Sequence, residues 1–227
     1  MKIEAVILDF DGTIVDSEPT WKIVIGEVFV SLGHKLSPEI MMLGSGMGIN
    51  QSVAMIIEKL DIKNADASKI VQQICENVYT KIINEAKVHP GFLTLVQCCK
   101  DNNLPLAVCT SSELTMVLPT LERINATEMF EVIHSAHGYA NMKPHPEPYL
   151  LTAEKLGVDI NQCVVVEDSI PGIKAGTASG AKTFAIPYEH DLEQVTQMDV
   201  EIAKDLGIVA SRIEFMLHDF SYESPSL

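Results

Sequence analysis

Short apolar runs alternate with helical patterns along much of the chain. Runs rich in β-branched residues occupy 3–8, 104–109, 163–166 and 181–186, and a weaker one occupies 130–135. Apolar residues at helical spacing separate each run from the next. This alternation is typical of βαβ units, in which a parallel sheet is buried on both faces by helices. The pattern therefore predicts an α/β fold built on a doubly wound parallel sheet.

The segment between the first two expected strands is too long for one crossover helix. Apolar residues repeat at three- and four-residue spacing over 21–32, which indicates an amphipathic helix. Similar spacing predicts helices at about 50–60 and 66–86. These helices are expected to form a small cap inserted into the core. The expected division is a core domain of residues 1–15 and 89–227 and a helical cap domain of residues 16–88.

Composition and charge narrow the class of protein. The chain has 227 residues, enough for a core domain that carries a smaller inserted one. No apolar run approaches the length of a membrane span, and the first residues, "MKIEAV", include an acid where a secretory signal is apolar. We therefore expect a cytoplasmic protein with no membrane partner, and a monomer. The chain has a net charge of −15 and lacks the clustered positive charge that binding to nucleic acid requires, so we expect no nucleic-acid partner.

Polar side chains gather where the expected strands end. Because the carboxyl ends of parallel strands meet at one edge of a sheet, and ligands bind there, these residues are candidates for one site. They are Asp9 and Asp11 after the first strand, Thr110, Ser111 and Ser112 after the second, Lys143 in "NMKPHPEPY", and Glu167 and Asp168 after "CVVV".

The chemistry of these residues indicates a cation and a phosphate. Asp9 and Asp11 stand one residue apart and repel each other unless a cation or a shared proton joins them. Hard oxygen ligands favour Mg²⁺, which commonly takes one or two carboxylates and keeps positions for water and a substrate phosphate. A carboxylate can then attack phosphorus, because the cation and Lys143 neutralise the phosphate that would repel it.

Each motif alone also has an ordinary explanation. "DGT" can be a turn after a strand, Lys143 a solvated loop lysine, and "EDS" the start of a helix. Together and in this order, however, "DFDGT", Thr110, "KPHPEPY" and "EDS" resemble the haloacid dehalogenase superfamily of phosphotransferases, with a Rossmann-like core. The helical insert is similar to the cap of the β-phosphoglucomutase-like branch, and "DSEPTW" is similar to its sugar-phosphate phosphatases.

The resemblance implies a role for each core residue. Asp9 would be the nucleophile that forms an aspartyl-phosphate. Asp11 would protonate the leaving oxygen and later activate water, while Thr110 and Lys143 would hold the transferring phosphoryl group.

The resemblance also implies how magnesium would be held. The ligands would be the carboxylates of Asp9 and Asp168 and the backbone carbonyl of Asp11. Glu167 would lie in that shell or next to it, and the sequence leaves this choice open.

Substrate recognition is expected to involve residues of both domains. The loop "GSGMGIN" between two cap helices is either a flexible connection or a segment that contacts substrate. The expected substrate-binding residues, besides Thr110 and Lys143, are Ser111 and Ser112 of the core and Glu18, Trp21, Ile49 and Asn50 of the cap.

Three functions remain open, and one is favoured. A mutase needs a second phosphate site, which in the family is supplied by a cap-loop arginine, and Ile49 stands about where that arginine would fall. Dehalogenases lack the second motif aspartate, and Asp11 is present. We therefore expect a magnesium-dependent phosphatase that hydrolyses a small phosphorylated metabolite, a sugar or polyol phosphate. The alternatives are a β-phosphoglucomutase-type mutase and a catalytically silent binding module on the same scaffold.

Overall fold

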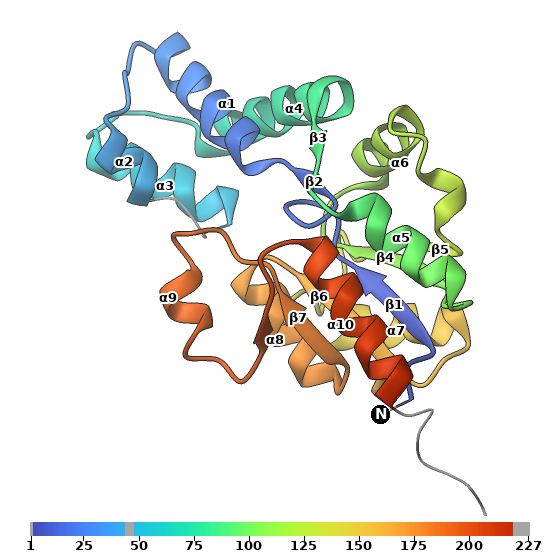
Figure 1. The fold of residues 1–227 in the computed structure, drawn as a ribbon. Coiled ribbons are helices and arrows are strands. Elements are labelled where there is room, and N and C mark those ends of the chain that lie inside the picture. Colours follow the sequence, from blue (N-terminus) through green and yellow to red (C-terminus); the bar gives the residue numbers. More distant parts are fainter. Residues whose placement is uncertain (1, 44–47, 220–227) are drawn as a thin grey trace, which may run out of the picture. The chain divides into compact units, whose positions relative to one another are not determined.

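The computed structural model describes residues 2–43 and 48–219, which form two compact units (Figure 1). One unit consists of the described residues up to Asp16 and from Lys87 onward, and the other is Ser17–Ala86. Two short antiparallel strands, β2 (Val15–Asp16) and β3 (Lys87–Val88), lie where the chain passes between the units. The loop residues 44–47, for which a substrate contact was considered, lie outside the described residues.

The first unit contains a parallel sheet of six strands in the order β5-β4-β1-β6-β7-β8. Their bounds are β1 Ala5–Leu8, β4 Leu106–Thr110, β5 Val132–Ser135, β6 Cys163–Glu167, β7 Lys182–Ala185 and β8 Glu201–Ile202. The predicted doubly wound α/β fold is confirmed. The chain runs outward from β1 through β4 to β5 and then returns to β6 on the other side, so the strand order reverses between β1 and β6. Ligand sites of open α/β sheets lie beside this reversal.

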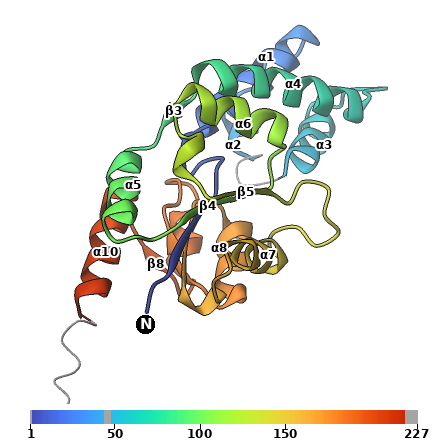
Figure 2. The same ribbon diagram turned by 90° about the vertical axis from the view of Figure 1, so that its right-hand side faces the viewer.

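Helices cover both faces of the sheet (Figure 2). One face carries α5 (Phe92–Asp101), α6 (Leu114–Arg123) and α10 (Leu206–Asp219), and the other carries α7 (Glu147–Leu156) and α8 (Ile170–Ser179). The short helix α9 (Leu192–Val195) follows β7. Since β1 is central and covered on both faces, all four of its residues are buried, as its apolar sequence "AVIL" requires.

The second unit is helical. It contains α1 (Glu18–Ser31), α2 (Pro38–Leu43), α3 (Ile49–Lys59) and α4 (Ala67–Glu85). The buried residues of α4 recur every four positions from Ile70 to Val78 and on to Ile82, and this stripe lets α4 pack on α1 and α3. The helix starts at an N-cap, Asp66, whose carboxylate accepts a hydrogen bond from the Lys69 amide.

Two elements differ from the sequence-based expectation. The second unit has a helix, α2 (Pro38–Leu43), in addition to the three helices for which the sequence predicted a range. The sheet also has a sixth strand, β8, that no apolar run predicted. None of the helices within residues 2–43 and 48–219 combines the length and the apolar character needed to cross a membrane.

Candidate active site

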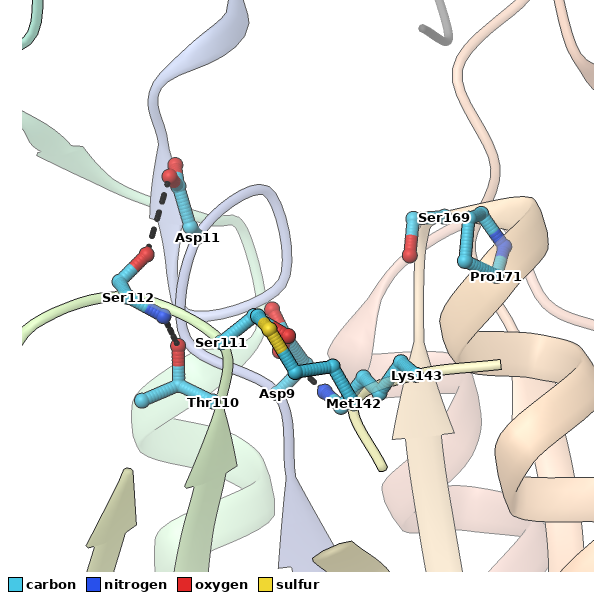
Figure 3. Close-up of a pocket in the computed structure, with 9 residues that line it drawn as sticks. All are labelled: Asp9, Asp11, Thr110, Ser111, Ser112, Met142, Lys143, Ser169 and Pro171. Atoms are coloured by element: carbon cyan, nitrogen blue, oxygen red, sulfur yellow. Dashed lines mark hydrogen bonds and ion pairs between the residues drawn. The ribbon is translucent and has the colours of Figure 1, made fainter. Parts of the chain in front are cut away.

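A cavity of about 310 Å³ lies at the carboxyl ends of the central strands of the sheet (Figure 3). It brings together six of the residues selected from the sequence, which are Asp9, Asp11, Thr110, Ser111, Ser112 and Lys143. Met142, Ser169 and Pro171 also line it, and none of these three was selected. The two remaining core candidates, Glu167 and Asp168, are buried at the end of β6.

The tight turn after β1 sets the position of Asp9. The Asp9 amide donates to the Val166 carbonyl at 3.0 Å, which extends the pairing of β1 with β6 by one residue. Gly12 then turns the chain with φ +96°, a conformation that side-chain-bearing residues rarely adopt. A Cβ atom at this glycine would lie 2.1 Å from Asp168 Oδ2. The glycine in "DFDGT" therefore allows both the turn and the close approach of Asp168.

Lys143 is a buried cation with three acceptors. Its Nζ donates to Asp9 Oδ1 at 2.6 Å, to Glu167 Oε1 at 2.7 Å and to the Cys109 carbonyl at 2.9 Å. Burial alone would lower the pKa of this ammonium, but the charges of Asp9 and Glu167 outweigh burial and hold the pKa well above its ordinary value. Lys143 thus keeps its proton and places a positive charge against Asp9.

Glu167 accepts hydrogen bonds on both carboxylate oxygens. Oε1 accepts from Lys143 and, at 2.8 Å, from the hydroxyl of Tyr149. Oε2 accepts from the amides of Asp168 and Ser169, each at 3.1 Å, and from the Ser169 hydroxyl at 3.0 Å. Five donors thus surround this fully buried carboxylate.

Three buried carboxylates form a cluster that fits a divalent cation. Oxygen atoms of Asp9, Glu167 and Asp168 lie within 4.8 Å of one another, and Lys143 forms ion pairs with Asp9 and Glu167. Burial, opposed by Lys143 and reinforced by Glu167, raises the pKa of Asp9 to about 7. Burial also raises the pKa of Asp168, and the charges of Glu167 and Asp9 add to the effect. When all three carboxylates are ionised, the cluster carries three negative charges against one positive charge, so it gains from a bound M²⁺ ion, and its all-oxygen donors suit Mg²⁺.

Hydroxyl groups line the side of the cavity next to β4. Ser112 donates from its amide to Thr110 Oγ1 at 3.0 Å and from its hydroxyl to Asp11 Oδ2 at 3.4 Å (Figure 3). The Ser135 hydroxyl at the end of β5 donates to the Ser112 carbonyl at 2.7 Å and so holds the loop. These bonds hold the loop after β4 so that the Ser112 hydroxyl contacts the second carboxylate, Asp11, which also lines the cavity.

The four cap candidates lie in the second unit. Glu18 and Trp21 are on α1, and Ile49 and Asn50 begin α3. Their role in substrate binding stays a prediction.

Sequence reasoning passed over Tyr149, which lies within the quoted motif "KPHPEPY" but received no role. An aromatic residue in an amphipathic helix is normally a packing residue, so nothing in the sequence indicated a hydroxyl aimed at Glu167.

Comparisons with known proteins agree with this geometry. A model of the haloacid dehalogenase-like hydrolase family matches residues 6–186. The Bacillus subtilis protein YhcW, provisionally named a phosphatase, is 30% identical over 216 residues, which are 89% of this chain and 97% of YhcW. Hexitol phosphatase B of Escherichia coli K12 is 29% identical over 191 residues, covering 82% of this chain and 84% of that protein.

A solved structure shows the same fold. The β-phosphoglucomutase of Clostridium difficile superimposes with a TM-score of 0.73 and covers 96% of this chain and 99% of its own. Because the two sequences are only 20% identical, this likeness shows a shared fold and nothing about function.

Proposed function

The chain belongs to the haloacid dehalogenase-like hydrolases, and from that premise we propose that it is a magnesium-dependent phosphatase of small phosphomonoesters. The observation that carries the proposal is the contact of 2.6 Å between Lys143 Nζ and Asp9 Oδ1 in a cavity lined by hydroxyls. A carboxylate beside a permanent cation can approach an anionic phosphate, which it would otherwise repel. The site thus combines a nucleophile with the charge that makes attack on phosphorus possible.

The proposed reaction has two steps. An Asp9 oxygen bonds to phosphorus as the bond from phosphorus to the substrate oxygen breaks, and Asp11 gives a proton to that leaving oxygen. Asp11 then takes a proton from water, the water oxygen bonds to phosphorus, and the bond to Asp9 breaks. Inorganic phosphate leaves, and both carboxyl groups return to their starting states.

The neighbouring residues have supporting parts in this proposal. Thr110 and Lys143 hold the oxygens of the transferring phosphoryl group, and the Ser112 hydroxyl orients Asp11. Asp9 and Asp168 would hold the magnesium with the backbone carbonyl of Asp11. When bound, the ion supplies positive charge that offsets the buried carboxylates and the substrate phosphate. Because both Glu167 oxygens already accept hydrogen bonds, we assign Glu167 to orienting Lys143 and the turn after β6.

We propose a sugar or polyol phosphate as the substrate class. Support comes from hexitol phosphatase B, a relative over most of the chain, and from the hydroxyl-lined cavity. A mutase would need a second cationic phosphate site, whereas Lys143 is the only cation among the described residues that line the cavity. The same point favours substrates with a single phosphate.

The test is a panel of phosphate esters with a matched pair of variants. Wild type, Asp9→Asn and the surface control Asp101→Asn are incubated with hexose, polyol, nucleotide and glycolate phosphates and β-glucose 1-phosphate, each with Mg²⁺ or EDTA. We expect Mg²⁺-dependent phosphate release concentrated on hexose or polyol phosphates, unchanged in Asp101→Asn and absent in Asp9→Asn.

Other outcomes identify which part fails. Isomerisation of β-glucose 1-phosphate without release would indicate the mutase. If the wild type released no phosphate from any ester, the binding module would be favoured. Phosphate release by Asp9→Asn would refute Asp9 as nucleophile. Release that persists in EDTA would refute the metal assignment.

A further inference from the structure

Tyr149 is buried beneath the ion pairs of the site and contacts both partners of one of them. It lies in the first turn of α7, and its side chain is 0% exposed. Its hydroxyl donates to Glu167 Oε1 at 2.8 Å, and Lys143 Nζ lies 4.8 Å from the centre of its ring. The ring face thus provides a cation–π contact to the ammonium while the hydroxyl holds the carboxylate.

The ring and the hydroxyl have separable purposes. The ring packs in a cluster with apolar residues of the sheet, including Ile7, Ala107 and Val165, and a phenylalanine would fill the same space. A buried hydroxyl costs free energy unless it is hydrogen-bonded, so packing alone does not account for a tyrosine here. The hydroxyl therefore has a role that is distinct from the core.

That role concerns the position of Lys143. A lysine ammonium sits at the end of a flexible four-carbon stem, and its location depends on its acceptors. Of the three acceptors of Lys143, the Cys109 carbonyl is fixed by β4, and Asp9 is the group that reacts. The third, Glu167 Oε1, is shared with Tyr149, whose hydroxyl is the donor that holds this oxygen besides Lys143 itself.

We propose that Tyr149 is a positioning residue that holds Glu167 Oε1 in place and so keeps Lys143 directed at Asp9. Tyr149 is not among the residues that line the cavity, so it acts on the reaction only through Glu167 and Lys143. The effect on turnover rests on the proposed phosphatase activity, whereas the hold on Lys143 does not.

The main test compares Tyr149→Phe with the matched control Tyr139→Phe. Tyr139 also has a hydroxyl bonded to a side chain, His134 Nε2 at 3.1 Å, but Tyr139 is 37% exposed and its partner is not one of the clustered carboxylates. With p-nitrophenyl phosphate and Mg²⁺, we expect Tyr149→Phe to lower kcat about tenfold with KM changed less than about threefold, since a bond to a charged group is lost without a substrate contact. Tyr139→Phe should leave both constants unchanged.

A double-mutant cycle tests the route of the effect. In a Glu167→Gln background, Tyr149→Phe should change kcat by less than about twofold, because the group through which the hydroxyl acts is already altered. An equal factor in both backgrounds would contradict the proposal and point to a loosened core instead.

A measurement without turnover separates this inference from the proposed function. Acetic anhydride labelling, read by mass spectrometry, should modify Lys143 several times faster in Tyr149→Phe than in wild type. The labelling rate of Lys155, which lies in α7 like Tyr149, should not change. A wild type inactive on every ester would refute the phosphatase activity, whereas the labelling rate of Lys143 would still test the role of Tyr149. Unchanged labelling of Lys143 in folded Tyr149→Phe would overturn the inference. If Tyr149→Phe does not fold, Glu167→Gln is labelled in its place. Faster labelling of Lys143 would then support the inference, and unchanged labelling would overturn it.

Discussion

Replacing Asp9 with asparagine should stabilise the metal-free protein while it abolishes turnover. The buried cluster of Asp9, Glu167 and Asp168 carries three negative charges when ionised, and Lys143 offsets one of them. Asparagine keeps the size of the side chain and removes one of these charges. Active sites commonly store instability of this kind, because function requires like charges to lie close together.

The magnitude follows from the pKa of Asp9. Burial raises this pKa from 3.8 to about 7, and each pKa unit corresponds to about 1.4 kcal/mol, so ionised Asp9 costs up to about 4 kcal/mol in the folded state. Since the folded pKa exceeds the unfolded one, the cost is absent below pH 3.8, grows up to about pH 7 and is fully present above it. The advantage of asparagine should therefore be largest at pH 8 and small at pH 4.5.

Urea unfolding in EDTA at pH 8 and pH 4.5 provides the measurement. The exposed Asp101→Asn serves as the control for the chemical change and should alter stability by less than about 0.5 kcal/mol. Adding Mg²⁺ should stabilise wild type more than Asp9→Asn, because the ion offsets the charge that the variant lacks. An Asp9→Asn protein no more stable than wild type at pH 8 in EDTA would refute the charge argument.

Three further predictions concern the turn, a buried histidine and the core. Gly12→Ala should weaken Mg²⁺ activation at least tenfold in a metal titration, because its Cβ would displace Asp168. Burial lowers the pKa of His134 below 6.5, so the contribution of His134 to stability should fall as pH drops below 6.5, by at most about 1.4 kcal/mol per pH unit, and the free energy of unfolding of His134→Gln in urea should rise relative to that of wild type over this range. Ile7→Ala, in the buried central strand, should cost about 2–5 kcal/mol in the same urea assay with the Mg²⁺ requirement unchanged.

The parts of the fold that sequence predicted are those whose burial leaves a continuous apolar signal. The strand at 163–166 was predicted because β6 is buried along its whole length. The strand β8 was not predicted, because it has only two residues and one of them, Ile202, is 37% exposed. An edge strand of this kind is set by its pairing with β7, which is a tertiary contact that a single-sequence pattern does not contain.

The site shows the same division between local and tertiary signals. Asp9 and Asp11 were selected because a charged pair after an apolar run is anomalous within the sequence itself. The Tyr149 hydroxyl, in contrast, becomes meaningful only once α7 is placed against the sheet, since its partner, Glu167, lies 18 positions away. The helical rotation that aims it at Glu167 depends on core packing across the sheet.

The order of the strands explains how one cavity separates two tasks. Asp9 follows the central strand, with β4 on one side and β6 on the other. The hydroxyls of Thr110 and Ser112 are at the end of β4, whereas the carboxylates of Glu167 and Asp168 are at the end of β6. In the proposed mechanism, the donors for the phosphate and the metal ligand Asp168 thus approach the nucleophile Asp9 from opposite sides. Lys143 joins the two sides, because its ammonium contacts the end of β4, Asp9 and Glu167 at once, so in the proposed mechanism phosphate binding and the order of the carboxylate cluster both depend on its position.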